Sequence, residues 1–591
     1  MDDEEELVKL RGDKKIPFPI LLKRILSYAH GHIGQLVLAF VLLLISVAVE
    51  ILLPLIISQL VDYLEASNVN MVLAIIIGMV LGYAGLALIG KLARYFEGIL
   101  LQKVGQTIVF ELRKEVFAHI EGMSQNQFNE MPVGSLVTRV CNYTAAISEL
   151  FTSVILNVFS NLLTIVAVFA IMAILSWRLS LILLAFAVVV GVVSYFFAKV
   201  IGDKFRKERK LVSALNTFLS ENLSGMRLIQ IFHQEKKKDK EFSGKNEELR
   251  KAAYGVNLAF TFYRPFISFL YYAAIAVTFG VGMALAFSAG EIVAFYLYLS
   301  RFFNPVQELA DQVNQIQHAF TSCERLFNLM DVEPEVVDDS DAIEIEKVEG
   351  KIEFDHVWFA YEKENWILKD VSFSVEPKQT VAFCGATGAG KTTILSLIVR
   401  NYKPQKGRIL IDGVDIAKIK IASLRRAIGQ MLQDVFLFSG TIQSNVTLHD
   451  EDFTKEQIKE ACDYVNASSF IDRLPKGLDE EVAESGGNFS AGQRQLLSFA
   501  RTVLHKPQIL ILDEATSNID TETEILIQNS LEKMKNIGTM LVVAHRLSTI
   551  QHADNIICLQ NGEIIEQGDH QSLLKKKGYY YRLYELQFAN R

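Results

Sequence analysis

Residues 380–400 read TVAFCGATGAGKTTILSLIVR, and this stretch decides the fold of the second half of the chain. Its first five residues are strand-like, its last seven are helix-like, and residues 385–392 match the phosphate-binding pattern Gly-x-x-x-x-Gly-Lys-Thr. Glycines let backbone N–H groups close around phosphate oxygens, and the helix N-terminus adds a favourable dipole. We expect Lys391 to face the β and γ phosphates and the Thr392 hydroxyl to suit Mg²⁺, within a nucleotide-binding set of Gly385, Thr387, Gly388, Gly390, Lys391, Thr392 and Thr393.

Two carboxylates end the apolar run ILILDE at residues 509–514. Such a pair more often marks only an exposed strand end, but here a phosphate-binding loop precedes it. We therefore expect Asp513 to hold Mg²⁺, directly or through water. Glu514 is then placed to polarise the attacking water as general base.

Short strand-like runs alternate with helical ones from residue 351 onward. The runs are KIEFDHVWF, VSFSVE, TVAFCG, ILILDEA, MLVVAH and NIICLQ. This alternation predicts an α/β domain over 351–591 with a largely parallel sheet. The acidic stretch before it, residues 331–350, has no long apolar run and is predicted to be a linker.

The composition indicates a membrane protein. Half of the 591 residues are hydrophobic, and the mean hydropathy is +0.25. The formal charge of −8 argues against a nucleic-acid partner, which normally meets a basic face. The five scattered cysteines form no Cys-x-x-Cys pair, so we expect free thiols in a reducing compartment.

Long apolar runs fill residues 1–330 and predict an all-α membrane domain. A spanning helix needs about 20 apolar residues. Six candidates meet this length, at roughly 34–60, 71–99, 147–176, 178–201, 260–288 and 291–320.

The connections between these runs predict the topology. Those at 100–146 and 202–259 are long, and the second is rich in Lys and Arg, so both long connections and both termini are expected in the cytoplasm. Their apolar spacing predicts helices that continue beyond the bilayer. The acidic N-terminus fits no cleaved signal or transit peptide, so the first span is expected to be uncleaved.

Residues 489–493, Phe-Ser-Ala-Gly-Gln, resemble the signature Leu-Ser-Gly-Gly-Gln of ABC ATPases. With the phosphate loop and the acidic strand end, the resemblance to ABC transporter ATPases covers about 351–580. It implies an ABC-type helical subdomain, ATP and Mg²⁺. It also implies further roles: Tyr361 stacks on adenine, Gln433 contacts Mg²⁺ and water, Asp520 crosses a dimer interface, His545 contacts the γ-phosphate, and Ser490, Gly492 and Gln493 face a partner's γ-phosphate.

The first half is similar to the six-helix exporter domain of the same family. The segments EFSGKNEELR, NQFNEMPVGSLVTRV and ENLSGMRLIQIFHQE look like its cytoplasmic extensions and coupling segments. A membrane domain followed by an ATPase in one chain is the half-transporter layout. The family then implies a second half-transporter as partner, with ATP held between one chain's phosphate loop and the other's signature.

Ala491 stands where the signature normally has glycine. A methyl group there restricts φ and adds bulk near phosphate. Complete catalytic residues with an altered signature resemble one subunit of bacterial heterodimeric multidrug exporters. The alternative is a homodimer that tolerates the alanine.

The functional prediction is ATP-driven export of hydrophobic or amphipathic, drug-like compounds across a bacterial cytoplasmic membrane. Glu50, in the first span, either attracts cationic amphiphiles or is a packing acid. Aromatic residues of the last two spans either line an apolar cavity, or they pack between helices or face lipid: Phe262, Tyr263, Phe266, Phe269, Tyr271, Tyr272, Phe295 and Tyr296. The alternatives are a lipid flippase or peptide exporter with the same ATPase, or an ATP-gated channel; a DNA-handling ATPase is disfavoured.

Overall fold

The computed structural model describes residues 16–66, 73–362, 365–514, 521–544 and 550–588. The chain divides into two compact units. The first, here called the membrane unit, comprises residues 1–121 and 131–333. The second, the ATPase unit, comprises residues 122–130 and 334–591.

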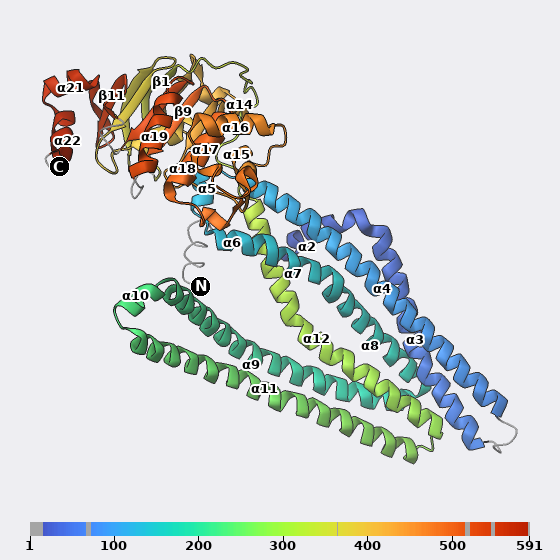
Figure 1. The fold of residues 1–591 in the computed structure, drawn as a ribbon. Coiled ribbons are helices and arrows are strands. Elements are labelled where there is room, and N and C mark those ends of the chain that lie inside the picture. Colours follow the sequence, from blue (N-terminus) through green and yellow to red (C-terminus); the bar gives the residue numbers. More distant parts are fainter. Residues whose placement is uncertain (1–15, 67–72, 363–364, 515–520, 545–549, 589–591) are drawn as a thin grey trace. The chain divides into compact units, whose positions relative to one another are not determined.

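Long helices build the membrane unit (Figure 1). Helix α3 packs on α4, α9 on α11, and α12 on both α3 and α8. Between α6 and α8 the chain passes through two π-helical turns at Arg139–Tyr143 and Leu150–Val154. The helices are α2 Phe18–Ala29, α3 Ile33–Ala66, α4 Leu73–Glu121, α6 Val133–Thr138, α7 Thr144–Glu149, α8 Ile155–Leu175, α9 Trp177–Ser224, α10 Met226–Ile231, α11 Glu235–Ala284 and α12 Ala289–Met330.

Five helical segments of the described chain are long and apolar enough to cross a membrane: the α2–α3 segment, α4, α8, α9 and α11. Helix α12 was the sixth predicted span, but Glu291, Arg301 and neighbouring polar residues lower its hydropathy. It nevertheless buries Phe295, Tyr298 and Phe303 within the bundle. As the apolar spacing predicted, α4, α9 and α11 continue as helix beyond their apolar stretches.

A six-stranded sheet in the order β12-β11-β3-β10-β9-β6 forms the centre of the ATPase unit. All neighbours are parallel except β11 and β12, so the predicted largely parallel sheet is confirmed. A second, antiparallel sheet has the order β2-β1-β4-β5. The strands are β1 Ile352–Phe359, β2 Leu368–Val375, β3 Thr380–Cys384, β4 Lys406–Ile411, β5 Val414–Asp415, β6 Ile428–Met431, β9 Ile509–Glu514, β10 Thr539–Ala544, β11 Asn555–Gln560 and β12 Glu563–Gly568, with a short pair β7 Gly440–Thr441 and β8 Glu481–Val482.

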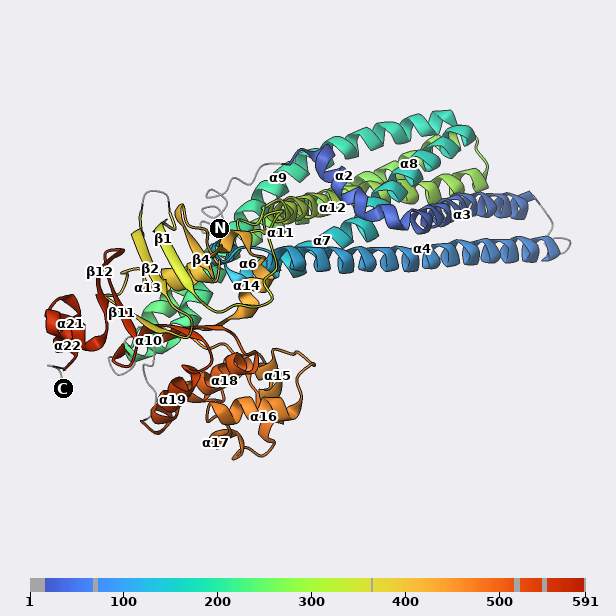
Figure 2. The same ribbon diagram turned by 90° about the horizontal axis from the view of Figure 1, so that it is seen from above.

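Helices α15 to α18 gather as a helical group beside α19, apart from the antiparallel sheet (Figure 2). Buried Ile458, Cys462, Leu497 and Phe499 join this group to the main core. The helices of the unit are α5 Gln125–Asn129, α13 Lys391–Ile398, α14 Ile421–Ala427, α15 Ile442–Thr447, α16 Lys455–Tyr464, α17 Ser468–Ile471, α18 Ala491–Leu504, α19 Thr521–Met534, α21 His570–Lys576 and α22 Tyr579–Phe588.

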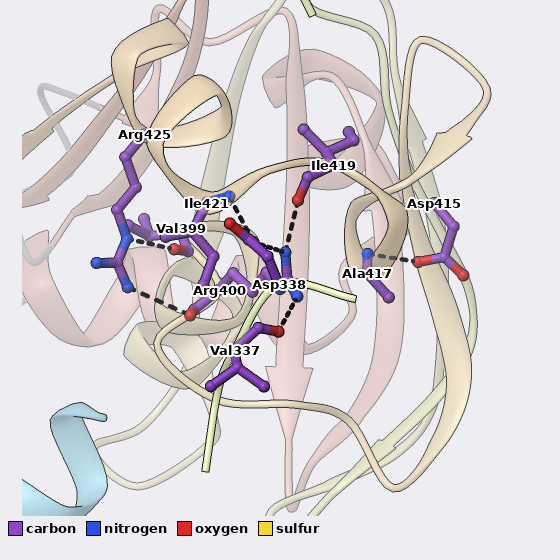
Figure 3. Close-up of polar contacts among 9 residues, drawn as sticks. All are labelled: Val337, Asp338, Val399, Arg400, Asp415, Ala417, Ile419, Ile421 and Arg425. Carbon is purple, nitrogen blue, oxygen red and sulfur yellow. Dashed lines mark hydrogen bonds and ion pairs between the residues drawn. The ribbon is translucent and has the colours of Figure 1, made fainter. Parts of the chain in front are cut away.

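The predicted linker at 331–350 is not a free segment. Asp331 pairs with Arg24 in the membrane unit, whereas residues from 334 onward pack on the ATPase unit. There the guanidinium of Arg400 donates to the carbonyl of Val337 at 2.8 Å, to the carbonyl of Ile419 at 2.6 Å and to the Asp338 carboxylate at 3.2 Å (Figure 3). Since Arg400 is buried, these acceptors replace the water that it would otherwise bind.

Helix α5 comes from the connection between the first-unit helices α4 and α6, yet it belongs to the ATPase unit. Ser124 and Gln127 form a capping box that starts the helix. The Glu335 carboxylate accepts hydrogen bonds from Ser124 Oγ and Asn126 Nδ2, at 3.3 Å and 3.2 Å. The first residues of the predicted segment NQFNEMPVGSLVTRV therefore belong to the ATPase unit.

The prediction that all five cysteines are free thiols is wrong. Cys384, the last residue of β3, forms a disulfide with Cys558 of β11. The two residues are directly paired in neighbouring parallel strands, so their side chains project from the same face of the sheet. Cys141, Cys323 and Cys462 are free.

Candidate nucleotide site

The phosphate loop connects the central strand β3 to α13, as the sequence predicted. Gly385, Gly388 and Gly390 have φ values of +146°, +83° and +102°, which L side chains rarely adopt. A Cβ at Gly385 would lie 2.3 Å from the Leu559 carbonyl oxygen. These glycines therefore allow a tight loop that turns N–H groups inward, the geometry that binds phosphate.

Lys391 lies across the base of this loop. Its side chain is buried, and its Nζ donates to the carbonyls of Gly385 and Ala386, each at 2.9 Å. Burial lowers the pKa of Lys391, while the negative charge of Asp513 acts in the opposite direction. The loop and the acidic strand end are thus within electrostatic reach of each other, as both motifs require.

Asp513 and Gln433 line one pocket at the edge of the sheet where parallel strands β9 and β6 end. Thr392 is exposed at the start of α13. In the described residues no group of three His, Cys, Asp or Glu side chains could hold a metal alone. Mg²⁺ is usually bound by one or two carboxylates together with oxygens of the nucleotide phosphates. The Thr392 hydroxyl, the Gln433 amide and the Asp513 carboxylate fit such a site.

Tyr361 follows β1 and is 45% exposed. Its hydroxyl is 3.1 Å from Thr393 Oγ1, which fixes the ring beside the phosphate loop. The edge of the ring meets Tyr402, with centroids 5.1 Å apart. An exposed aromatic ring held there fits stacking on a nucleotide base.

Tyr402 is a neighbour of this site that the sequence did not reveal. Its hydroxyl interacts with the side chain of Asn129 in α5, and burial raises its pKa. It therefore connects α5 to the ring of Tyr361. Its only sequence signal is an aromatic residue shortly after the helix that follows the phosphate loop.

The signature residues begin helix α18. Ser490 is the N-cap, and its Oγ accepts from the Gln493 N–H at 3.2 Å while Gln493 Oε1 accepts from the Ser490 N–H at 2.9 Å. Ala491 is exposed and Gly492 buried. No hydrogen bond in the described part of the chain links Ser490 or Gln493 to the phosphate loop of the same chain.

Three predicted site residues are not placed in full. The backbone of Glu514 ends β9 opposite Ala544 of β10, but its side chain lies outside the described part. Asp520 and His545 also lie outside the described residues. Their roles remain predictions.

Comparison with known proteins decides the family. The chain is 39% identical over 576 residues to the putative ABC transporter ATP-binding protein exp8 of Streptococcus pneumoniae, covering 96% of this chain and 97% of that one. The chain belongs to the ABC transporter family. Its residues 36–306 match the family model of the ABC transporter transmembrane region, and residues 368–517 match the model described as ABC transporter.

Other relatives are named by what they transport. The probable multidrug resistance ABC transporter YheH of Bacillus subtilis is 37% identical, over 85% of this chain and 76% of that one. The ATP-dependent lipid A-core flippase of Syntrophus aciditrophicus is 33% identical, over 96% and 94%. A bacterial Atm1-family ABC exporter, solved with ATP bound, superposes with a TM-score of 0.79 at 27% identity, over 94% of this chain and 98% of that one.

These comparisons confirm the exporter-type half-transporter fold and an ATPase whose hydrolysis is coupled to transport. Exporters of this family act as dimers, and this one is a membrane-spanning chain.

Proposed function

We propose that this chain is one half of a heterodimeric exporter that uses ATP hydrolysis to expel hydrophobic or amphipathic compounds across a bacterial cytoplasmic membrane. One observation carries the proposal: a phosphate loop, Lys391 and Asp513 come together in a chain whose described residues include five helical segments long and apolar enough to cross a membrane. The ATPase unit and both termini are proposed to be cytoplasmic.

Each site residue then has a role. Backbone N–H groups of the loop at Gly385, Thr387, Gly388 and Gly390 bind phosphate oxygens, together with Lys391 and Thr393. Thr392, Asp513 and Gln433 hold Mg²⁺, which would neutralise phosphate charge when bound.

The remaining roles complete hydrolysis and the dimer. Tyr361 stacks on adenine, Glu514 takes a proton from the attacking water, and His545 contacts the γ-phosphate. Ser490, Gly492 and Gln493 act in the partner's nucleotide site, and Asp520 lies at the interface.

The name of the Bacillus subtilis relative supports a drug-like substrate. Most of the aromatic residues predicted for a cavity wall are exposed in the single chain, which both a cavity wall and a lipid-facing surface require: Phe262, Phe266, Phe269, Tyr272 and Tyr296. Tyr263 and Phe295 are buried and pack within the bundle. Glu50 interacts electrostatically with Arg301 of α12, which favours its role as a packing acid.

A lipid flippase is the second candidate, since a relative that aligns over nearly the full length is named as one.

The test uses the complete assembly in proteoliposomes, with ATP hydrolysis, dye extrusion and lipid translocation measured on one preparation. We expect Glu514→Gln to reduce hydrolysis and transport by about 100-fold or more because a general base is lost. Glu451→Gln, a change at an exposed carboxylate on the same unit, serves as the matched control.

Near-normal hydrolysis in Glu514→Gln would contradict the proposed base. Lipid translocation without dye extrusion would replace the drug exporter by the flippase. A nucleotide-dependent current without uphill transport would replace both by a channel.

A further inference from the structure

The Cys384–Cys558 pair lies directly beneath the phosphate loop. Cys384 is the residue before Gly385, and Cys558 is the residue before Leu559, whose carbonyl packs against Gly385. In the register of the sheet, Cys384 pairs directly with Cys558. The disulfide therefore joins the two backbone segments on which the loop rests.

We propose that Cys384 and Cys558 are a reversible oxidant-responsive pair that locks the base of the phosphate loop. The proposal uses the proposed cytoplasmic location of the ATPase unit. In that compartment glutathione and thioredoxin keep thiols reduced, and the disulfides that do form are mostly transient or redox-sensing. Two cysteines paired in neighbouring strands are then a site where an oxidant can form a disulfide.

The geometry allows both redox states without moving the backbone. The two Cα atoms are 4.7 Å apart, within the range of about 4.4–6.8 Å that a disulfide spans. The strand pairing that sets this distance continues through Val381, Ala382 and Phe383 of β3. Hydrogen bonds of the sheet therefore hold the two thiols together after reduction.

The pairing of two thiols makes the site selective. Cys558 is fully buried and Cys384 is 4% exposed, so only a small oxidant reaches the pair from the side of Cys384. Cys462 is buried to a similar degree, but it is a free cysteine with no second cysteine paired to it, so it cannot form the same bond.

The reaction balances with hydrogen peroxide as oxidant. The thiolate of one cysteine attacks a peroxide oxygen, the O–O bond breaks, and a sulfenic acid and water form. The second thiol then attacks that sulfur, the S–S bond forms, and a second water leaves with the remaining proton. Two thiols lose two electrons and one peroxide molecule gains them. A thiol reductant reverses the change by exchange.

The expected effect is a more stable ATPase unit. The bond spans a sequence separation of 174 residues that contains Lys391, α18 and Asp513. Closing so long a loop restricts the unfolded chain, so we expect the oxidised unit to melt roughly 5–15 °C higher than the reduced one.

The test uses the full-length assembly in nanodiscs, treated with hydrogen peroxide or with dithiothreitol. Differential alkylation and mass spectrometry identify cross-linked peptides. Thermal unfolding is followed by tryptophan fluorescence in a Trp177→Phe background, where the remaining Trp358 and Trp366 both report on the ATPase unit. Cys558→Val removes the pair, and Cys141→Ser, at an exposed free cysteine, is the matched control.

We expect a Cys384–Cys558 peptide and the higher melting temperature after peroxide, both lost in Cys558→Val and kept in Cys141→Ser. If Cys384 and Cys558 can both still be alkylated after peroxide treatment, the proposal is overturned. An equal melting shift in Cys558→Val would also overturn it, because that result would assign the effect to other groups. Neither readout depends on transport or hydrolysis, so these results are separate from the test of the proposed function.

Discussion

Ala491 occupies the first helical position of α18, and its methyl group is exposed. The sequence suggested that a methyl here would restrict φ, but the backbone at this position is helical and outside the left-handed region. Alanine is the residue best suited to a helix, by about 1 kcal/mol over glycine in a helix interior. The alanine therefore does not strain the backbone of this chain, and its methyl group lies at the protein surface.

Ala491→Gly tests this interpretation. We expect a small loss of stability, about 1 kcal/mol or less, because glycine is less favourable in a helix. In the proposed heterodimer, hydrolysis changes little, since Ala491 faces the weaker site. Chemical denaturation and steady-state ATP hydrolysis of the assembly measure both.

The control is Ser490→Ala, which removes the N-cap and should cost about 1 kcal/mol. A large rise in ATP turnover with Ala491→Gly would count against the heterodimer and favour two equal, weakened sites.

At the scale of elements, α13 connects the nucleotide site to the segment that leaves the membrane unit. The helix ends at Ile398, and Arg400 adopts a φ of +55°. Its buried guanidinium then reaches the backbone at Val337 and Ile419 as well as Asp338 (Figure 3). Asp338 also accepts the N–H of Ile421 at 2.8 Å. One side chain thus holds two chain segments, at Val337–Asp338 and at Ile419, to the end of the phosphate-loop helix.

Arg400→Met should destabilise the ATPase unit by about 2–4 kcal/mol, because it leaves buried acceptors and a carboxylate without their donor. Arg408→Met is the matched control. It breaks another Arg–Asp pair, with Asp355, that is exposed, and should cost less than about 1 kcal/mol. Urea unfolding followed by Trp358 and Trp366 fluorescence measures both. Equal losses in the free energy of unfolding for the two variants would show that the buried contacts of Arg400 do not stabilise the unit more than an exposed ion pair does.

At the scale of the whole molecule, exporters of this family function as dimers. Signature residues and phosphate loop share no hydrogen bond within the described chain, and α10 exposes Leu228 and Ile231. Both features agree with the dimers that this family forms.

Native mass spectrometry of the complex from its source membrane tests the composition of the dimer. We expect one copy of this chain and one second chain of similar size. The second chain's residue at the position of Glu514 would then show whether only one site hydrolyses ATP. Two copies of this chain would contradict the heterodimer, and Ala491 would then be a tolerated change in two equal sites.

Several features of this protein could be predicted from short stretches of sequence. The phosphate loop, the strand ending at Asp513 and the apolar helices depend on residues close together in the chain, because loop chemistry and hydrophobic periodicity are local. The N-terminal capping of α18 is also local, since Ser490 and Gln493 lie one turn apart. The sixth span was harder to identify because polar residues such as Glu291 and Arg301 interrupt the apolar run of α12.

Only the tertiary structure decided which distant residues meet. The Cys384–Cys558 pair depends on β11 lying next to β3 in one particular register, and a shift of one residue would turn Cys558 to the other face. Arg400 reaches Val337 only because the chain returns across α13, and α5 joins the ATPase unit through Glu335. Such contacts follow from strand order and chain crossings over tens to hundreds of residues, which no local pattern records. The sequence by itself therefore predicted which residues form the nucleotide site, and the tertiary structure decided which distant contacts hold the phosphate loop and α13 in place.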